Sequence, residues 1–514
     1  MIILGISENV HDASACIIKN GRLISAVISE RYSKKKKDSN LSPSSLSNLL
    51  FQSNIKPSEI DLVACALCGH DSEDYEIDFL NNKGSLRMRE FLIDGDNNIK
   101  RNGYYIPHHI CHASSAYYTS NFQESVSLSV DCCEFNPQLG KKLNSLVCHF
   151  KDNHLLDYKF PECYSGAMYA KTTEYTGFSP CLERAGTLMG LSAYGKYSEK
   201  YERLIAEEKT ISTDGKTWAK GKYPEYEKNL KEAMDCAKTV QDIFEDELLE
   251  YSNECVNYFN VPHVKNICLS GGSFLNCNAN SKIKLKSRYE NVHLFPGCGD
   301  DGLAIGAALF LAHNVLDMPL QKYQPQDLCY LGVEYPIYKD IDHKYIAQKI
   351  AEGKIVGFMN GRSEFGPRAL GNRSIFADPR NQHTRDWINQ IVKKREWFRP
   401  FAPMVLEEKY QEWFDFPIPS PFMLYTAQVK QPEKIPAVTH VDGSSRFQTV
   451  NEKSNPDAYK IVKEFEKITG IPVLLNTSLN GKGQPILEDE NDALKFFNDT
   501  EIDMMVVFGK IFEK

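Results

Sequence analysis

The sequence predicts an α/β protein with two domains. Apolar, strand-like runs at residues 2–6, 126–130 and 266–269 alternate with helical patterns in the N-terminal part, and such alternation is typical of layered α/β folds. A chain of 514 residues is also too long for one ordinary hydrophobic core. These two observations predict α/β layering in more than one domain.

A break in composition predicts where the domains meet. All 15 cysteines lie at or before Cys329. The break coincides with proline-containing stretches at residues 318–326 and 333–336, and such segments often separate domains. We therefore expect an N-terminal domain of residues 1–335 and a C-terminal domain of residues 336–514.

The clearest helix is predicted between residues 240 and 259, where apolar residues recur at steps of three and four. The stripe consists of Val240, Phe244, Leu248, Tyr251, Cys255 and Phe259. Residues 196–235, just before it, are polar and charged. We expect this preceding segment to be a surface insertion.

Composition and charge argue against several classes of protein. A content of 42% hydrophobic and 25% charged residues is that of a soluble globular protein. The formal net charge of −8 gives no reason to expect nucleic acid as a partner. The sequence contains no run of 18 or more apolar residues, so it predicts no membrane span. The N-terminus does not resemble a signal peptide. Irregularly spaced cysteines within apolar runs indicate reduced thiols, so we expect a cytoplasmic protein.

Three strand-like runs end in turns rich in small or polar residues. His11 and Asp12 follow the first run, Asp131 ends the second, and Ser270-Gly271-Gly272 with Asn276 follow the third. In α/β folds ligands bind beyond the carboxyl ends of strands, and glycine lets the backbone approach a phosphate or a base. Each turn alone is a weak signal. Together the three predict a nucleotide-binding cleft formed by two lobes.

A pair of histidines is a candidate metal site. If residues 108–112 are helical, His108 and His112 lie on one face and can share a metal ion. The alternative is a helix start with structural histidines, and an isolated HxxxH does not decide between them. Asp131 and Asp300 at strand ends would complete a mixed nitrogen and oxygen shell, which suits iron(II), manganese or zinc.

The C-terminal domain concentrates arginines among turn-forming and aromatic residues. They lie in residues 361–374, 393–401 and 442–446, and residues 475–480 add hydroxyl and amide groups. Guanidinium groups bind phosphate with two parallel hydrogen bonds, so we predict a polyphosphate or acyl-phosphate site. The basic run 34–37 is either a solvated loop or a phosphate contact at the edge of the cleft, and composition does not decide.

Several motifs resemble the NodU/CmcH/TobZ family of O-carbamoyltransferases over nearly the whole chain. The C-terminal motifs are the most specific part of the resemblance. The resembling stretches are His11-Asp-Ala-Ser14, Glu30-Arg-Tyr32, His109-Ile-Cys-His112-Ala113, Met189-Gly-Leu-Ser-Ala-Tyr-Gly195, Gly299-Asp300, Phe365-Gly-Pro-Arg-Ala-Leu-Gly371, Phe398-Arg-Pro-Phe-Ala-Pro403 and Leu475-Asn-Thr-Ser478.

The resemblance implies a fold and a reaction. It implies a two-lobed N-terminal domain of the ASKHA (actin/sugar kinase/Hsp70-like) type and a YrdC-like α/β C-terminal domain. In such enzymes the C-terminal domain converts carbamoyl phosphate and ATP, bound with Mg²⁺, into carbamoyl-adenylate. The N-terminal domain then transfers the carbamoyl group to a small-molecule acceptor, with a hydroxyl or an amine as its nucleophile.

The resemblance also implies roles for individual residues, carried over by motif. The metal ligands are His108, His112, Asp131 and Asp300, with Fe²⁺ as the first choice of ion and Mn²⁺ or Zn²⁺ as alternatives. The adenylate contacts in the first domain are Ser270, Gly271, Gly272 and Asn276, beside Asp12. His11 resembles the general base and Lys36 the lysine on the phosphate side. The contacts of carbamoyl phosphate and ATP are Arg368, Arg373, Lys393, Arg399, Arg446, Asn476 and Ser478.

Two departures from the family pattern leave the acceptor open. Thr187 stands where many relatives carry a lysine, and Cys132-Cys133 replaces small residues after Asp131. Two other functions also stay open: a tRNA threonylcarbamoyl-adenosine-type modification enzyme, which the acidic net charge speaks against, and a catalytically decayed nucleotide-binding sensor. We expect no nucleic-acid partner and no membrane contact, and a homodimer is left open.

Overall fold

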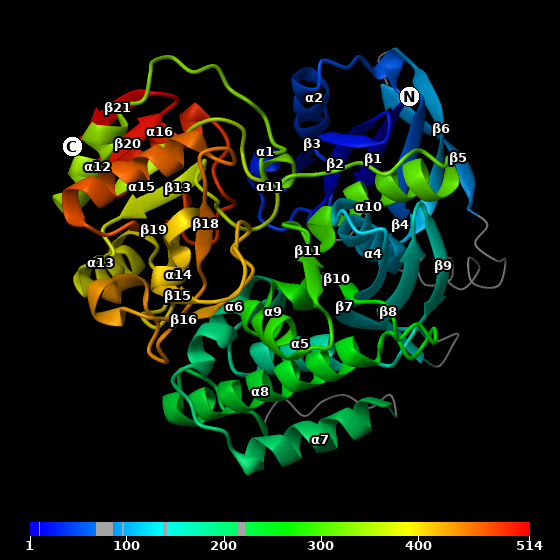
Figure 1. Cartoon of the computed structure of the whole chain (residues 1–514), viewed down its shortest axis with the longest axis horizontal. Helices are drawn as coiled ribbons and strands as arrows, with labels where there is room; N and C mark the ends of the chain where they lie inside the picture. Colours follow the sequence, from blue (N-terminus) through cyan, green and yellow to red (C-terminus); the bar gives the residue numbers. More distant parts are fainter. Residues whose placement is uncertain (10, 68–85, 95–96, 137–140, 214–221) are drawn as a thin grey trace.

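The computed structural model describes residues 1–9, 11–67, 86–94, 97–136, 141–213 and 222–514 (Figure 1). Within these residues the strands form two sheets in the N-terminal part, and a seven-stranded and a three-stranded sheet in the C-terminal part. Figure 1 shows the N-terminal part as two lobes, one around β1–β6 and one around β7–β11, with the C-terminal part beside them. The α/β class and the predicted strands at residues 2–6, 126–130 and 266–269 are confirmed.

The two N-terminal sheets share one topology. In the first, β3-β2-β1 are antiparallel and β4 and β6 continue in parallel, with β5 at the edge. In the second, β9-β8-β7 are antiparallel and β10 and β11 continue in parallel. The two lobes of the expected ASKHA-type domain are therefore present.

The strands of these sheets have the following bounds. The first sheet contains β1 (Ile2–Ser7), β2 (Ser14–Lys19), β3 (Arg22–Ile28), β4 (Leu62–Leu67), β5 (Met88–Asp94) and β6 (Ile99–Pro107). The second contains β7 (Glu124–Asn136), β8 (Lys141–Lys151), β9 (His154–Lys159), β10 (Asn266–Ser270) and β11 (Asn291–Leu294).

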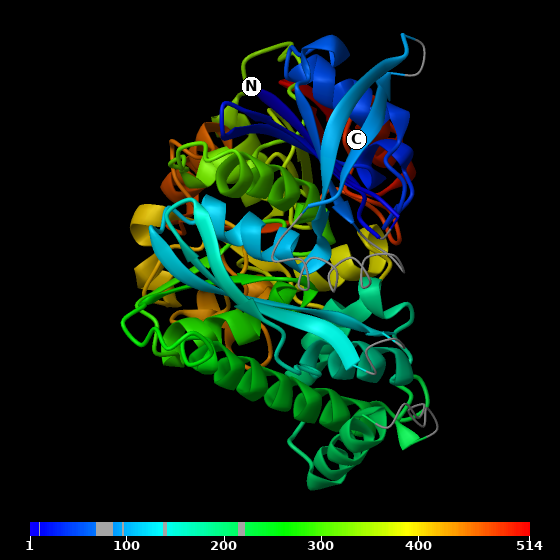
Figure 2. The same ribbon diagram turned by 90° about the vertical axis from the view of Figure 1, so that its right-hand side faces the viewer.

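Two buried helices lie between the lobes, α4 (His108–Thr119) and α10 (Leu303–Phe310). Both pack on strands of the N-terminal sheets, and Figure 2 shows α4 between the two sheets. They approach each other closely because α10 has glycine at position 306, where a Cβ atom would lie 1.8 Å from the carbonyl oxygen of Cys111. This close packing fixes the start of α4 against the start of α10.

Helices cover the outer face of the second lobe. They are α5 (Ser165–Tyr175), α6 (Cys181–Ser192), α7 (Glu199–Thr213), α8 (Leu230–Glu254) and α9 (Cys277–Lys286). The predicted apolar stripe lies mostly on α8, which ends at Glu254 rather than continuing to Phe259. Among the described residues, no helix is both long enough and apolar enough to cross a membrane.

The segment 196–235 is only partly the surface insertion that we expected. It contains α7 and the first residues of α8, and α7 lies along the outside of α8 at the bottom of Figure 1. Tyr201 and Ile205 of α7 are buried in the core. Sparse apolar residues in a charged sequence therefore still attach this helix to the lobe.

The C-terminal part is built on a mixed sheet of order β18-β14-β19-β13-β12-β20-β21. Its strands are β12 (Val356–Met359), β13 (Arg373–Ala377), β14 (Ala402–Leu406), β18 (Gln448–Val450), β19 (Val473–Ser478), β20 (Met504–Val507) and β21 (Lys510–Glu513). The main helices are α12 (His343–Ala351), α13 (Gln382–Trp387), α15 (Pro456–Thr469) and α16 (Glu490–Asp499). The α/β character is as expected, whereas the likeness to YrdC and the boundary at residue 335 stay predictions.

A buried ionic cluster joins the first lobe to the C-terminal part. Arg31 and Glu488 are 3% and 1% exposed, and the nearest charged atoms of the two side chains are 3.8 Å apart. Glu488 also accepts a 2.9 Å hydrogen bond from Ser363 and lies 3.7 Å from the guanidinium of Arg373. Charges buried this deeply are costly without their partners. Moving the two parts relative to each other would separate Arg31 from Glu488, so the cluster stabilises their relative position.

Candidate functional site

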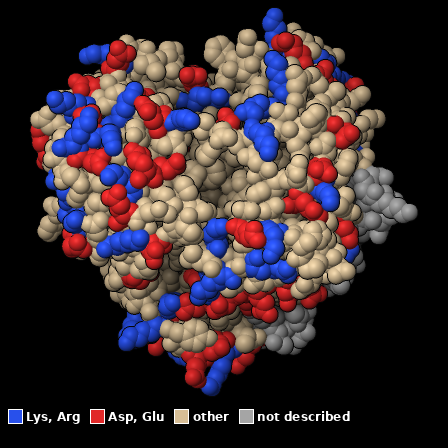
Figure 3. All heavy atoms as spheres, viewed as in Figure 1, with Lys and Arg blue, Asp and Glu red and all other residues tan. Residues whose placement is uncertain are grey.

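A cavity of about 520 Å³ lies between the N-terminal lobes and the C-terminal part. Its lining residues come from both, from His11 near the N-terminus to Ile486. The space-filling view shows the protein hollowed near the centre of this face, between the two parts (Figure 3). The strand-end turns with His11, Asp131 and Gly272 all reach this cavity, as the sequence predicted for a cleft between two lobes.

The four residues predicted as metal ligands converge at one end of the cavity. His108, His112, Asp131 and Asp300 each offer one ligand atom, and these atoms lie within 4.8 Å of one another. Nε2 of His112 lies 3.1 Å from Nε2 of His108 and 3.1 Å from Oδ2 of Asp131. It also lies 3.3 Å from Oδ1 of Asp300. The four ligand atoms therefore lie close enough together to share one ion.

Local structure explains this convergence. His108 and His112 stand one helical turn apart at the start of α4, as the HxxxH spacing predicted. Asp300 lies in the short 3₁₀ turn Asp300–Gly302 that leads into α10, and close packing of α10 on α4 brings it to the histidines. Asp131 lies in β7 just after the buried residues 126–130.

The donor set fits a divalent cation. Two imidazoles and two carboxylates make a mixed shell that suits Fe²⁺, Mn²⁺ or Zn²⁺. Oδ1 of Asp300 is buried without a hydrogen-bond partner, and an uncompensated buried carboxylate oxygen is costly. Burial acts to raise the pKa of Asp131, but hydrogen bonds from His108 and His112 hold it well below its usual range. A cation would provide the same compensation.

His11 lies next to this cluster. Its Nδ1 is 2.8 Å from Oδ2 of Asp12, and its Nε2 is 3.5 Å from Oδ2 of Asp300. Burial acts to lower the pKa of His11, but the charge of Asp300 and the hydrogen bond with Asp12 outweigh it and raise the pKa to about 9. Asp12 therefore fixes the orientation of the ring, and the second ring nitrogen points toward the cluster.

Lys36 and Lys37 both line the cavity, and they pair with different acids. The ammonium of Lys37 donates to Oδ2 of Asp12, whereas Nζ of Lys36 lies 3.5 Å from Oε2 of Glu183 on α6. Asp12 and Lys37 both have left-handed backbone conformations, with φ of 62° and 56°. Such conformations are strained for non-glycine residues and are often found at functional sites. The role implied for Lys36 stays a prediction, and Lys37 is a lining residue that the run of four lysines did not single out.

The turn after β10 supplies only part of the predicted adenylate contacts to the cavity. Gly272 and Asn276 line it, whereas Ser270 and Gly271 do not. Ser270 is fully buried. Gly271 has φ of 91°, and a Cβ atom there would lie 2.3 Å from the carbonyl oxygen of Val130. These two residues shape the turn that presents Gly272.

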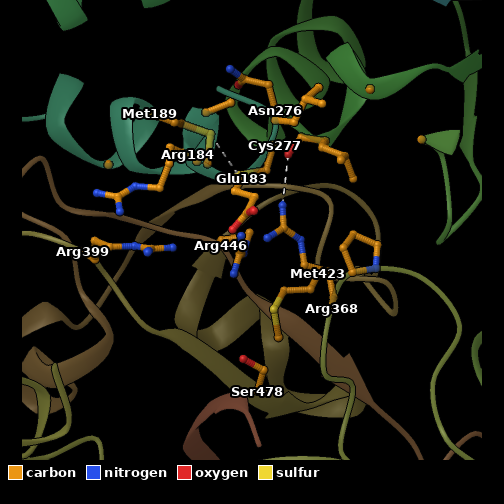
Figure 4. A pocket seen from close by; sticks show the side chains of 18 of the residues that line it. Glu183, Arg184, Met189, Asn276, Cys277, Arg368, Arg399, Met423, Arg446 and Ser478 are labelled. Carbon is orange, nitrogen blue, oxygen red and sulfur yellow. Dashed lines mark hydrogen bonds between the residues drawn. The ribbon is translucent and has the colours of Figure 1, made fainter. Parts of the chain in front are cut away.

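Basic residues of the C-terminal part line the other end of the cavity. In Figure 4, Arg368, Arg399 and Arg446 point into the space below α6, and Ser478 lies at its floor. Burial lowers the pKa of Arg446 to about 9, with the charges of Arg368 and Arg399 acting in the same direction. Buried charges of one sign are costly without partners, and a bound anion would reduce that cost. The predicted phosphate site therefore has the expected electrostatic character.

Lys393 and Asn476 sit at the same end. Nζ of Lys393 lies 2.7 Å from Oδ1 and 2.9 Å from the carbonyl oxygen of Asn480, and it also donates to Ser478. Burial and the charges of Arg395 and Arg399 nevertheless hold the pKa of Lys393 well below its usual range. Oδ1 of Asn476 is buried without a hydrogen-bond partner, which leaves it available to a ligand.

The structure places Arg373 elsewhere. Its guanidinium is fully buried and donates to the carbonyl oxygens of Asn360, Gly361, Asn372 and Glu488 at 2.9–3.2 Å. Its guanidinium carbon lies 5.8 Å from the ring centroid of Tyr335 and 5.7 Å from that of Phe508, and Arg373 does not line the cavity. Arg373 organises the turn around residue 361 and contacts the buried Glu488.

Several lining residues were not singled out from the sequence. Arg184 and Glu183 come from α6, where nothing in the motif indicates contact with another domain. Arg395 and Glu396 lie in the predicted arginine-rich run, but the run does not reveal which side chains point inward. Of the departures from the family pattern, Thr187 is buried, and the side chains of Cys132 and Cys133 lie outside the described part of the chain.

Acidic residues predominate at one end of the cavity and basic residues at the other, although Lys37 contacts Asp12 at the first end and Glu396 contacts Arg184 at the second. Acidic residues surround the histidines, and they are Asp12, Glu30, Asp131, Asp300 and Asp301. Basic residues line the other end, and they are Arg184, Arg368, Lys393, Arg395, Arg399 and Arg446. One end therefore suits a cation and the other a polyanion. The fold and the cavity together define a two-lobed α/β protein with a candidate metal site and a candidate anion site along one cavity.

Comparison with known families agrees with this class. The family model described as "Carbamoyltransferase N-terminus" matches residues 91–309, and the model described as "Carbamoyltransferase C-terminus" matches residues 347–514. An uncharacterized protein of Synechocystis sp. is 31% identical over 100% of this chain and 96% of its own length. The chain belongs to the carbamoyltransferase family, and it is a transferase.

Named relatives agree with the resemblance seen in the motifs. Nodulation protein NolNO of Sinorhizobium fredii is 31% identical over 98% of this chain and 79% of its own length. The 3'-hydroxymethylcephem-O-carbamoyltransferase of Amycolatopsis lactamdurans is 31% identical over 65% of each chain. Among solved structures, the activator of the 2-hydroxyisocaproyl-CoA dehydratase from Clostridium difficile is 14% identical, covers 61% of this chain and 94% of its own, and has a TM-score of 0.36.

Proposed function

We propose that the protein is an ATP-dependent O-carbamoyltransferase that forms carbamoyl-adenylate and passes its carbamoyl group to a small-molecule acceptor. The observation that carries the proposal is the single cavity with a basic end and an acidic, histidine-containing end. Residues 336–514 form the adenylate, and residues 1–335 perform the transfer. One continuous space lets a labile intermediate pass between them without release into water.

The basic end suits the meeting of carbamoyl phosphate with ATP and its Mg²⁺. Water breaks the P–O bond of carbamoyl phosphate, so that phosphate leaves and carbamate remains. A carbamate oxygen then attacks the α-phosphorus of ATP and displaces pyrophosphate. Arg368, Arg399 and Arg446 offset the negative charge of the two substrates, and Lys393, held by Ser478 and Asn480, adds a positive charge once it is protonated. The unpartnered Oδ1 of Asn476 accepts from the carbamoyl amide.

The acidic end suits transfer. The acceptor hydroxyl attacks the carbamoyl carbon, AMP leaves with the bridging oxygen, and His11 takes the hydroxyl proton. Asp12 orients the ring through Nδ1, and Lys37 holds Asp12 in turn. A divalent ion at His108, His112, Asp131 and Asp300 would polarise a carbamoyl or phosphate oxygen and offset the Asp300 charge that raises the pKa of His11.

A small-molecule hydroxyl is the acceptor that we favour. The relative from Amycolatopsis lactamdurans is named for carbamoylation of a hydroxymethyl group on a small molecule. An amine is a stronger nucleophile than a hydroxyl and has less need of a base. The pairing of His11 with Asp12 therefore favours an oxygen nucleophile.

The test is release of pyrophosphate from ATP without acceptor or RNA. We expect pyrophosphate to appear only when carbamoyl phosphate is added. Mass spectrometry of the quenched reaction should then detect carbamoyl-adenylate or its breakdown to AMP. Failure to consume ATP in the presence of carbamoyl phosphate, with folded and metal-loaded protein, would refute the proposal.

A further inference from the structure

We propose that Arg184 of α6 binds a phosphate group of the polyphosphate ligand in the basic end, and that the Glu396 carboxylate holds the place of this phosphate in the ligand-free protein. The inference rests on the proposed function, because it takes the basic end as the site of ATP. It adds an arginine from the N-terminal part to arginines that come from the C-terminal part.

Glu396 lies between arginines from two parts of the chain. Its Oε1 accepts a hydrogen bond from Nη2 of Arg184. Its Oε2 lies 3.8 Å from Nη1 of Arg399. The side chain of Glu396 is 14% exposed, and those of Arg184 and Arg399 are 26% and 29% exposed. One carboxylate therefore faces two guanidinium groups at the wall of the cavity.

The arrangement leaves hydrogen-bonding groups unused. Nε of Arg184 and Oε2 of Glu396 are buried and have no hydrogen-bond partner, and the same is true of Nε in Arg368 and Arg446. Buried polar groups normally find a partner. A phosphate presents three acceptor oxygens in place of the two of a carboxylate. It can therefore satisfy donors that Glu396 leaves unsatisfied.

Arg184 is held in position for this role. Its guanidinium lies over the ring of Phe178, 5.7 Å from the ring centroid. The neighbouring Glu183 pairs with Lys36 at 3.5 Å and so does not neutralise Arg184. In Figure 4, Arg184 extends from α6 and its guanidinium lies above Arg399. The first turn of α6 thus presents a cation to ligands bound by the C-terminal part.

The class of ligand follows from the geometry. A planar guanidinium matches phosphate oxygens with two parallel hydrogen bonds. Several guanidiniums around one space need a ligand with more than one negative charge, so the β- and γ-phosphates of ATP, or pyrophosphate, fit better than a monoanion. Binding such a ligand frees Glu396 from Arg184 and joins α6 to the phosphate site.

The experiment measures binding of inorganic pyrophosphate to the full-length protein by calorimetry. We expect Arg184→Gln to weaken binding by about ten- to a hundredfold, since charged hydrogen bonds of this kind are lost. We expect Glu396→Gln to tighten binding several-fold, because the competing carboxylate is neutralised. The control is Arg203→Gln, which removes an exposed ion pair with Glu199 on α7 and should leave binding unchanged.

Opposite shifts in the two variants support the proposal, and melting temperatures close to that of the wild type exclude a folding defect. Unchanged affinity in Arg184→Gln, or equal weakening in both variants, overturns it. The Glu396→Gln result keeps the test decisive if Arg184→Gln folds poorly. Carbamoyl-phosphate-dependent ATP consumption by the wild type is measured in parallel. If the wild type consumes no ATP while the pyrophosphate affinities of the two variants shift as expected, the proposed reaction is refuted and the anion site is supported.

Discussion

Gly306 on α10 faces the carbonyl oxygen of Cys111 on α4, with room for no larger side chain: a Cβ atom would lie 1.8 Å from that oxygen. This contact sets the separation of the two helices that present Asp300 and the histidine pair. The precision of the metal-ligating cluster therefore depends on a residue that takes no part in it.

Gly306→Ala should separate the two helices. We expect a loss of unfolding free energy of about 1–3 kcal/mol from overpacking and weaker binding of added Fe²⁺ or Mn²⁺, measured by urea denaturation and by metal titration. Gly186→Ala is the matched control, because this glycine also lies in a helix but a Cβ atom added to it would meet no neighbouring atom within 4 Å. The control should be neutral or slightly stabilising. Equal metal affinity in Gly306→Ala and wild type would contradict the argument.

His112→Ala should abolish stoichiometric metal binding. The imidazole of His112 is fully buried and lies within 3.3 Å of the other three ligand residues. Elemental analysis of purified protein and the rise in melting temperature on adding metal both report the site; a ligand at ~100 times its Kd stabilises by about 2.7 kcal/mol. His149→Gln, at a histidine paired with Glu124, should keep the metal. Full metal content in His112→Ala would refute this ligand set.

Variants at the two ends should separate the two half-reactions. We expect His11→Asn to retain release of pyrophosphate but to lose carbamoyl transfer by about 10²–10⁴-fold, the usual contribution of a general base. We expect Arg399→Ala to lose pyrophosphate release, because a charge that offsets the substrates is missing. Both activities are followed in one assay. Pyrophosphate release is measured directly, and carbamoylation of the acceptor is measured by mass spectrometry. Equal loss of adenylate formation in the two variants would refute the assignment of the two half-reactions to different ends of the cavity.

Binding of pyrophosphate should take up a proton at alkaline pH. Burial beside Arg395 and Arg399 lowers the pKa of Lys393, and a bound anion favours the ammonium and raises it again. Between the lowered pKa and the ordinary value of 10.5, the neutral amine must therefore gain a proton when the ligand binds. Calorimetry in two buffers of different ionisation enthalpy measures this uptake. Lys393→Met should reduce it, and an identical uptake in that variant would assign the proton to another group.

The sequence predicted features that depend on local order. Strand ends, the HxxxH helix and the small residues after β10 are local patterns, and the structure brings His11, Asp131, Asp300 and Gly272 together as the strand-end argument required. Strand ends, helix periodicity and turns are encoded by residues that are close together in the chain, which explains why the sequence predicted them.

Other features depend on which way a side chain turns in the folded protein. Arg373 and Arg368 lie in the same glycine-rich segment, yet one donates to backbone carbonyls in the interior and the other lines the cavity. Lys36 and Lys37 are adjacent in the chain, and they pair with acids on different elements. Sequence patterns could not separate these pairs, because the partners come from distant parts of the chain.

The buried contact of Arg31 with Glu488 has a consequence for dissecting the molecule. If the protein were expressed as two fragments divided after residue 335, Arg31 would lie on one fragment and Glu488 on the other. Each fragment would then expose a charge whose partner is on the other fragment. The halves should then recover only when mixed, as complementing partners. Linkage in one polypeptide therefore serves folding, and it would also serve the proposed passage of carbamoyl-adenylate between the two parts.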